Sequence, residues 1–164
     1  MAKRAGNLYE QRFFTEALSR GFEVFIPLGD YLPQDAIVMN SAGKLFKVQV
    51  KGTEKKDREG GFGRYSICSS SGRGARKPID CTKVDVLVAY IGHEDVFYII
   101  PSVLLDSAMR VSLYPHNPNS KAKHEKFKEN WDIFKTTWVI YPPPCYNCNW
   151  CIISVRRITQ ECEL

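Results

Sequence analysis

The sequence contains no long apolar run. None of its hydrophobic segments approaches the ~18 to 20 residues of a membrane-spanning helix, and residues 1–7 lead into a polar helix without an apolar signal-peptide core. A glycine-rich phosphate loop, a dinucleotide-binding fingerprint and internal repeats are also missing. We therefore expect the 164 residues to form a soluble cytoplasmic protein that does not enter a membrane.

The positive charge of the chain is concentrated in one stretch. The formal net charge is +5, and residues 51–83 alone carry nine basic and four acidic side chains. A basic, Gly/Ser-rich segment suits contact with a polyanion, most commonly a phosphate backbone. A solvated loop with no partner is the alternative.

Six cysteines are present, and four of them lie near the C-terminus. Cys145, Cys148 and Cys151 form a C-x2-C-x2-C run, and Cys162 follows. Four thiolates could hold zinc or an iron–sulfur cluster, but the second C-x2-C pair of a zinc knuckle is missing. The pattern therefore favours reduced thiols in a Pro/Cys-rich extension, residues 136–164, after a first domain at residues 1–135.

The hydrophobic pattern of the first domain predicts one helix followed by several strands. The helix ends at Gly21, a residue that favours helix C-termini. The strand with the clearest alternation places Phe46, Val48 and Val50 on one face and Lys47, Gln49 and Lys51 on the other. The expected helices cover residues 7–20, 102–109 and 121–134, and the expected strands cover residues 22–27, 34–39, 44–51, 84–91 and 96–100, with a short segment at 65–68.

This order predicts an α/β fold: a mixed β-sheet of at least four strands with the first helix against one face. On that helix, Glu10 falls inside the apolar arc that runs from Tyr9 through Phe13 to Leu18. An inward carboxylate is costly unless it is paired. Because Glu10 also lies near the start of the helix, the helix dipole and solvent offer another explanation for it.

Polar side chains are predicted to converge at one edge of the sheet. If residues 34–39 and 44–51 form a hairpin, one register places Asp35 opposite Gln49, with Lys51 next on the same face. Glu10, Asp35, Gln49 and Lys51 would then form a site for metal-assisted phosphodiester hydrolysis, because Mg²⁺ prefers carboxylate and amide oxygens. A lysine there would orient the attacking water or offset charge on the phosphate. An ordinary polar sheet edge is the alternative.

The stretch from residue 6 to residue 100 resembles the PD-(D/E)XK nuclease superfamily, closest to its group I intron-associated (homing) endonuclease branch. The resemblance rests on Glu10, on Asp35 and on the Gln49-x-Lys51 pair in their order along the chain, and on the segments 6–10, 21–30, 46–53, 84–90 and 96–101 around them. Archaeal Holliday-junction resolvases are similar over the first half. The resemblance implies a restriction-endonuclease-like fold with flanking helices.

The resemblance also implies roles for these residues. Asp35 and Gln49 would bind Mg²⁺, for which Mn²⁺ would substitute, with the Val50 carbonyl as a further ligand; Glu10 would contribute directly or through water, and Lys51 would be the catalytic lysine. Two positions depart from the family pattern: Gln34 precedes Asp35 where the family has proline, and Gln49 replaces an acidic residue. Losing that negative charge should weaken metal binding.

The expected activity is a metal-dependent DNA endonuclease, either homing-type or junction-resolving. It would act as a homo-oligomer, because one small domain carries one site and a double-strand break needs two nicks. A nuclease fold that binds DNA and no longer cuts it is the alternative that Gln49 favours. The residues expected to contact backbone phosphates are Lys55, Lys56, Arg58, Arg64, Arg73, Arg76 and Lys77.

Overall fold

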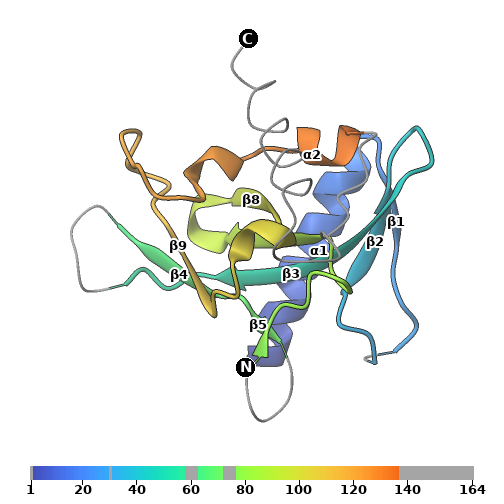
Figure 1. Ribbon diagram of the computed structural model, residues 1–164, viewed down its shortest axis with the longest axis horizontal. Coiled ribbons are helices and arrows are strands. Elements are labelled where there is room, and N and C mark those ends of the chain that lie inside the picture. Colours follow the sequence, from blue (N-terminus) through green and yellow to red (C-terminus); the bar gives the residue numbers. More distant parts are fainter. Residues whose placement is uncertain (1, 30, 58–62, 72–76, 137–164) are drawn as a thin grey trace, which may run out of the picture.

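The computed structural model describes residues 2–29, 31–57, 63–71 and 77–136 (Figure 1). Among these, no helix is both long enough and apolar enough to cross a bilayer. The α-helices are α1 (Ala2–Ser19) and α2 (Asp132–Lys135), and the 3₁₀ turns are η1 (Gly92–Glu94), η2 (Ser102–Leu105) and η3 (Glu125–Phe127). The strands are β1 (Glu23–Phe25), β2 (Ala36–Met39), β3 (Leu45–Thr53), β4 (Tyr65–Cys68), β5 (Ser70–Ser71), β6 (Lys77–Pro78), β7 (Val86–Ile91), β8 (Val96–Pro101) and β9 (Arg110–Leu113).

The main sheet is mixed and has the order β1-β2-β3-β7-β8. Strands β3 and β7 are parallel, and every other neighbouring pair is antiparallel. The β3–β7 pair is the crossover, and the chain between these strands contributes β4, β5 and β6. The predicted α/β fold with a mixed sheet is confirmed.

Each face of this sheet carries its own apolar core. On one face, α1 buries Phe13, Phe14 and Ala17 against the β-strand side chains. On the other, Tyr65 and Ile67 of the β4–β9 ribbon pack over Leu87 and Ala89 of β7. Strand β7 is therefore buried on both sides, which explains its continuous apolar sequence. Figure 1 shows α1 crossing the strands of the sheet, with β4 and β9 on the left of the view.

The prediction of one helix over residues 121–134 is wrong. The chain forms only η3 and α2 there, because tertiary bonds to β8 replace helical ones. Glu129 has a φ of 51°, in the left-handed region; its N–H donates to the Phe97 carbonyl at 2.7 Å, and its carboxylate accepts the Phe97 N–H at 2.6 Å. Phe127 then packs on one face of the sheet and Trp131 on the other, which one helix face could not do.

Two smaller expectations also need correction. The helix expected over residues 102–109 is only η2, because Asp106 and Ser107 both adopt positive φ. Leu18, placed at the edge of the apolar arc of the first helix, is 53% exposed. Its position at the border of the arc left it outside the contact with the sheet.

Candidate active site

The β2–β3 hairpin has the register that the sequence analysis considered for it. Ala36 pairs with Val48. In the same register, the next position along the hairpin places Asp35 opposite Gln49. The Asp35 N–H continues the ladder by donating to the Val48 carbonyl at 2.8 Å. The last pair of residues between β2 and β3 is Ala36 with Val48, whereas β3 itself continues to Thr53. Groups from both sheet faces can therefore meet at this edge.

Asp35 is fixed in place by the backbone of β3. Its Oδ2 accepts the Val50 N–H at 2.7 Å. Since β3 is the central strand of the sheet, this bond ties the carboxylate to the most rigid part of the fold. Val50 thus has an observed role in holding Asp35, and its carbonyl as a metal ligand stays a prediction.

Gln49 is the least satisfied polar residue of the site. It is only 4% exposed, and its Nε2 donates to the Pro33 carbonyl at 2.9 Å. That bond fixes the amide orientation, so Oε1 is the remaining acceptor. Oε1 is buried and has no hydrogen-bond partner among the described residues. A buried, unsatisfied acceptor costs about 1–3 kcal/mol, and a bound cation would remove that cost.

Three of the predicted residues line one pocket at the sheet edge, whereas Gln49 and Val50 are buried beside them in sequence and are not part of its wall. Glu10 from α1, Asp35 before β2 and Lys51 from β3 share a cavity of about 480 Å³. Glu10 is half-buried, so its inward direction serves this pocket. The other residues of the wall were not predicted as site residues: Gly6, Asn7, Ile26, Pro27, Gly29, Leu32 and Gln34.

Gly52 lets α1 approach β3 beside Lys51. A Cβ built at Gly52 would lie 2.4 Å from Cδ2 of Tyr9, closer than any real contact. The Tyr9 ring also meets Tyr90 edge-on, with 5.7 Å between ring centroids. Burial, followed by the charge of Glu54, raises the pKa of Tyr9 above its usual 10. The Tyr9 ring therefore lies between α1 and β3, one residue before Glu10 on the helix. A glycine inside a strand is the sequence signal that could have revealed this contact.

Replacing Gly52 by alanine should displace Tyr9 and with it Glu10. We expect a loss of about 1–3 kcal/mol in unfolding free energy, as for other overpacked sites, and slower cleavage. The double variant Tyr9→Ala/Gly52→Ala should recover stability relative to the sum of the single variants, because the clash is gone. Chemical denaturation measures this. Additive losses would show that the two residues do not share this contact.

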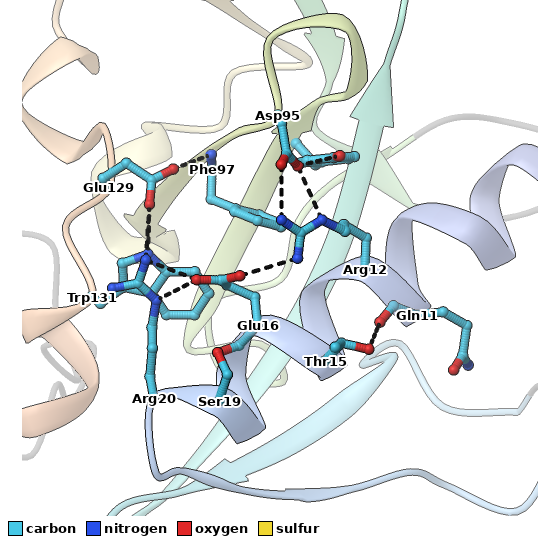
Figure 2. A network of polar contacts seen from close by, with 11 residues as sticks. Gln11, Arg12, Thr15, Glu16, Ser19, Arg20, Asp95, Phe97, Glu129 and Trp131 are labelled. Atoms are coloured by element: carbon cyan, nitrogen blue, oxygen red, sulfur yellow. Dashed lines mark hydrogen bonds and ion pairs between the residues drawn. The ribbon is translucent and has the colours of Figure 1, made fainter.

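A polar network anchors α1 two residues beyond Glu10 (Figure 2). The Arg12 guanidinium donates to both oxygens of Asp95, at 3.0 and 2.8 Å. These bonds, together with one from Tyr90, hold the pKa of Asp95 below its ordinary value. Glu16 of α1 bridges Arg12 and Arg20, which directly follows the helix. Isolated surface pairs are worth little, but a bidentate pair fixes geometry, so the network holds the helix that carries Glu10.

The predicted phosphate-contact residues divide into three groups. Lys55 and Lys56 follow β3 and are exposed, and Lys77 opens β6 and is also exposed. Arg64 is paired with Asp57 at 2.9 Å. Arg58, Arg73 and Arg76 lie outside the described residues, as do Cys145, Cys148, Cys151 and Cys162.

The donor set fits a hard divalent cation. The residues that could hold one are Asp35, Gln49 and Glu10, and all of their candidate donor atoms are oxygens, which Mg²⁺ prefers. The orphaned Gln49 Oε1 is the independent observation in favour of a ligand. Among the described residues, no group of three or more His, Cys, Asp or Glu side chains could hold a metal. The site differs from such clusters because an amide replaces one carboxylate.

Comparison with known proteins finds a family model and similar solved structures. Residues 1–134 match the family model described as PD-(D/E)XK endonuclease. A solved structure, "The structure of a bacterial homing endonuclease: I-Ssp6803I", is 27% identical and covers 81% of this chain and 93% of its own, with a TM-score of 0.70. No curated protein sequence matches.

Proposed function

Because the chain belongs to the PD-(D/E)XK endonuclease family, whose restriction-endonuclease-like fold it has, we propose that it is a Mg²⁺-dependent, homing-type endonuclease that hydrolyses phosphodiester bonds in DNA. The observation that carries the proposal is the pocket shared by Glu10, Asp35 and Lys51. The unsatisfied Oε1 of Gln49, a residue of the same strand as Lys51, supports it. The resemblance to the homing endonuclease I-Ssp6803I supports this type over a junction resolvase.

Each candidate site residue has a role in this reaction. Asp35, Gln49 and the Val50 carbonyl would hold the divalent ion, and Glu10 would complete the set directly or through water. When bound, the ion supplies positive charge to the scissile phosphate and acidifies a water molecule. Lys51 would donate hydrogen bonds to that water or to a phosphate oxygen, which offsets the negative charge that develops there. The Asp35–Val50 bond keeps the carboxylate from turning away.

Oligomerisation and location follow from the same proposal. One chain contributes one pocket, so a double-strand break needs two copies, and we propose a cytoplasmic homo-oligomer. The exposed Lys55, Lys56 and Lys77 would contact backbone phosphates, which gives affinity and register without sequence preference.

Metal-dependent nicking tests the proposal directly. Supercoiled plasmid and a synthetic four-way junction are each incubated with the protein in Mg²⁺, Mn²⁺ or EDTA, alongside a Lys51→Ala variant. We expect cutting of plasmid that needs the metal and falls about 100-fold or more in Lys51→Ala, as when an electrostatic stabiliser is removed. Exclusive cutting of the junction would replace the homing type with a resolvase.

Gln49 favours a second candidate, a nuclease fold that binds DNA without cutting it, because an amide supplies one negative charge fewer than a carboxylate. This protein would retain DNA in EDTA with a steep salt dependence. It would nick neither substrate at any Mg²⁺ or Mn²⁺ concentration. Metal-dependent cutting that Lys51→Ala removes would exclude it.

A further inference from the structure

Exposed apolar side chains gather beside the candidate active site. Nine large hydrophobic residues are exposed among those described, and five of them fall within residues 25–32, the end of β1 and the loop toward β2. We call Ile26, Leu28, Tyr31 and Leu32 the apolar rim. Leu28 is 103% exposed and Tyr31 is 91% exposed. In Figure 1 the segment between β1 and β2 projects from the lower right of the molecule.

The apolar rim continues the wall of the pocket. Ile26 and Leu32 line the same cavity as Asp35 and Lys51. Whatever places a phosphate in that cavity therefore lies against the rim. Ile26 and Leu32 form part of the wall of the cavity in which the cut phosphate would lie, so the substrate itself is the occupant that this geometry favours.

The chemistry of the rim selects which part of the substrate it meets. Residues 24–39 contain no lysine or arginine, so this segment has no cationic side chain to hold phosphates. The parts of a duplex that suit aliphatic and aromatic side chains are the sugars and the faces of bases. Apolar side chains inserted between base pairs unstack a step and bend the duplex.

Gly29 and two prolines restrict the backbone of the described residues in this loop. Gly29 has a φ of +101°, and a Cβ built on it would lie 2.6 Å from the Tyr31 ring. Only glycine allows this turn and the close packing of the ring. Pro27 and Pro33 flank the tip and reduce its freedom further. Prolines that restrict the backbone before binding lower the conformational entropy lost on binding.

We propose that the apolar rim is a wedge that enters the base stack next to the cut phosphate and unwinds the duplex there. This inference rests on the proposed DNA cleavage. The wedge would favour flexible pyrimidine–purine steps, which unstack at the lowest cost, and it would give sequence preference to a protein whose basic contacts have none.

Plasmid topology tests the wedge without knowledge of the target site. The Lys51→Ala protein, which should not cut, is bound to plasmid in Ca²⁺ while a metal-independent topoisomerase relaxes the DNA. Unwinding by the wedge lowers the linking number in proportion to bound protein. The rim variants Leu28→Ala, Tyr31→Ala and Leu32→Ala are made in the same background. The matched control is Leu45→Ala, because Leu45 is 55% exposed and Leu32 54%, and Leu45 does not line the pocket.

We expect each rim variant to lose at least half of the linking-number change per bound protein and roughly tenfold in affinity, typical for a lost stacking contact. The Leu45→Ala control should change neither. Normal binding with no linking-number change, or an equal change in all variants, would overturn the wedge and leave the nuclease intact. Rim variants that dissociate an oligomer in light scattering while unwinding DNA normally would assign the rim to a second copy instead. Failure of the Lys51→Ala protein to bind plasmid at all would overturn the DNA endonuclease as well.

Discussion

An Asp35→Asn variant should fold normally, bind DNA like the wild-type protein and cut it about 100-fold more slowly or worse. The amide oxygen of asparagine can still accept the Val50 N–H that Asp35 now accepts at 2.7 Å, so the anchor to β3 survives. The negative charge that would bind the ion is lost. Loss of even a supporting group typically weakens a metal site 10- to 100-fold, and Asp35 is proposed as a direct ligand. Single-turnover cleavage and gel-shift binding in Ca²⁺ measure the two effects separately.

The companion variant Asp35→Ala separates structure from chemistry. Alanine removes the charge and the acceptor together, so it should lose cleavage as Asp35→Asn does. It should also lose about 1.5–3 kcal/mol of unfolding free energy, the usual value of a hydrogen bond to a charged group. Full activity in Asp35→Asn would show that Asp35 acts only through its bond to β3. Parallel loss of DNA binding would remove its assignment as a ligand.

The core of the site could be predicted because it depends on regular geometry. A strand side chain alternates with period two, and a hairpin register is decided by which face is apolar. Phe46, Val48 and Val50 therefore indicated the buried face, and the pairing of Asp35 with Gln49 was one of the registers that this face allows. The conflict between the charge of Glu10 and the apolar arc of the helix drew attention to this residue, and the family resemblance assigned it to the site. Such a conflict often marks a functional position.

The parts that sequence could not supply depend on long-range contacts. Glu129 adopts a left-handed conformation and pairs with Phe97 across 32 residues, which overrides the helical propensity of its neighbours. The hydrogen bond from Gln49 to the Pro33 carbonyl depends on where the loop lies, and local pattern carries no such information. The sequence also does not distinguish the loop that forms the apolar rim from an ordinary buried apolar segment, because the exposure of its side chains is a property of the folded structure.

The second large effect is expected at Gln49, where a carboxylate would restore the family pattern. In Gln49→Glu the new side chain is buried and faces the Pro33 carbonyl, which now accepts from the amide at 2.9 Å. Without metal, the ionised form would be repelled there, so burial raises the pKa of the new carboxyl and it is held protonated. We expect the metal-free variant to lose about 1–3 kcal/mol of stability. Cleavage at low Mg²⁺ should be preserved or increased.

Thermal unfolding with and without Mg²⁺, in the absence of DNA, measures both the stability lost without metal and the stability that the metal restores. Ligand that binds only the folded state adds about 2.7 kcal/mol at a hundredfold excess over Kd, and each kcal/mol moves Tm by roughly 2–4 °C at this size. Mg²⁺ should therefore raise the Tm of Gln49→Glu more than that of the wild-type protein. Because binding must release the proton, the difference should grow as the pH rises through about 6 to 8. The control Gln49→Met has a similar length and no oxygen, so its metal-dependent shift should be smallest. Equal shifts in all three proteins would place the ion away from Gln49, and the buried Oε1 would then need another explanation.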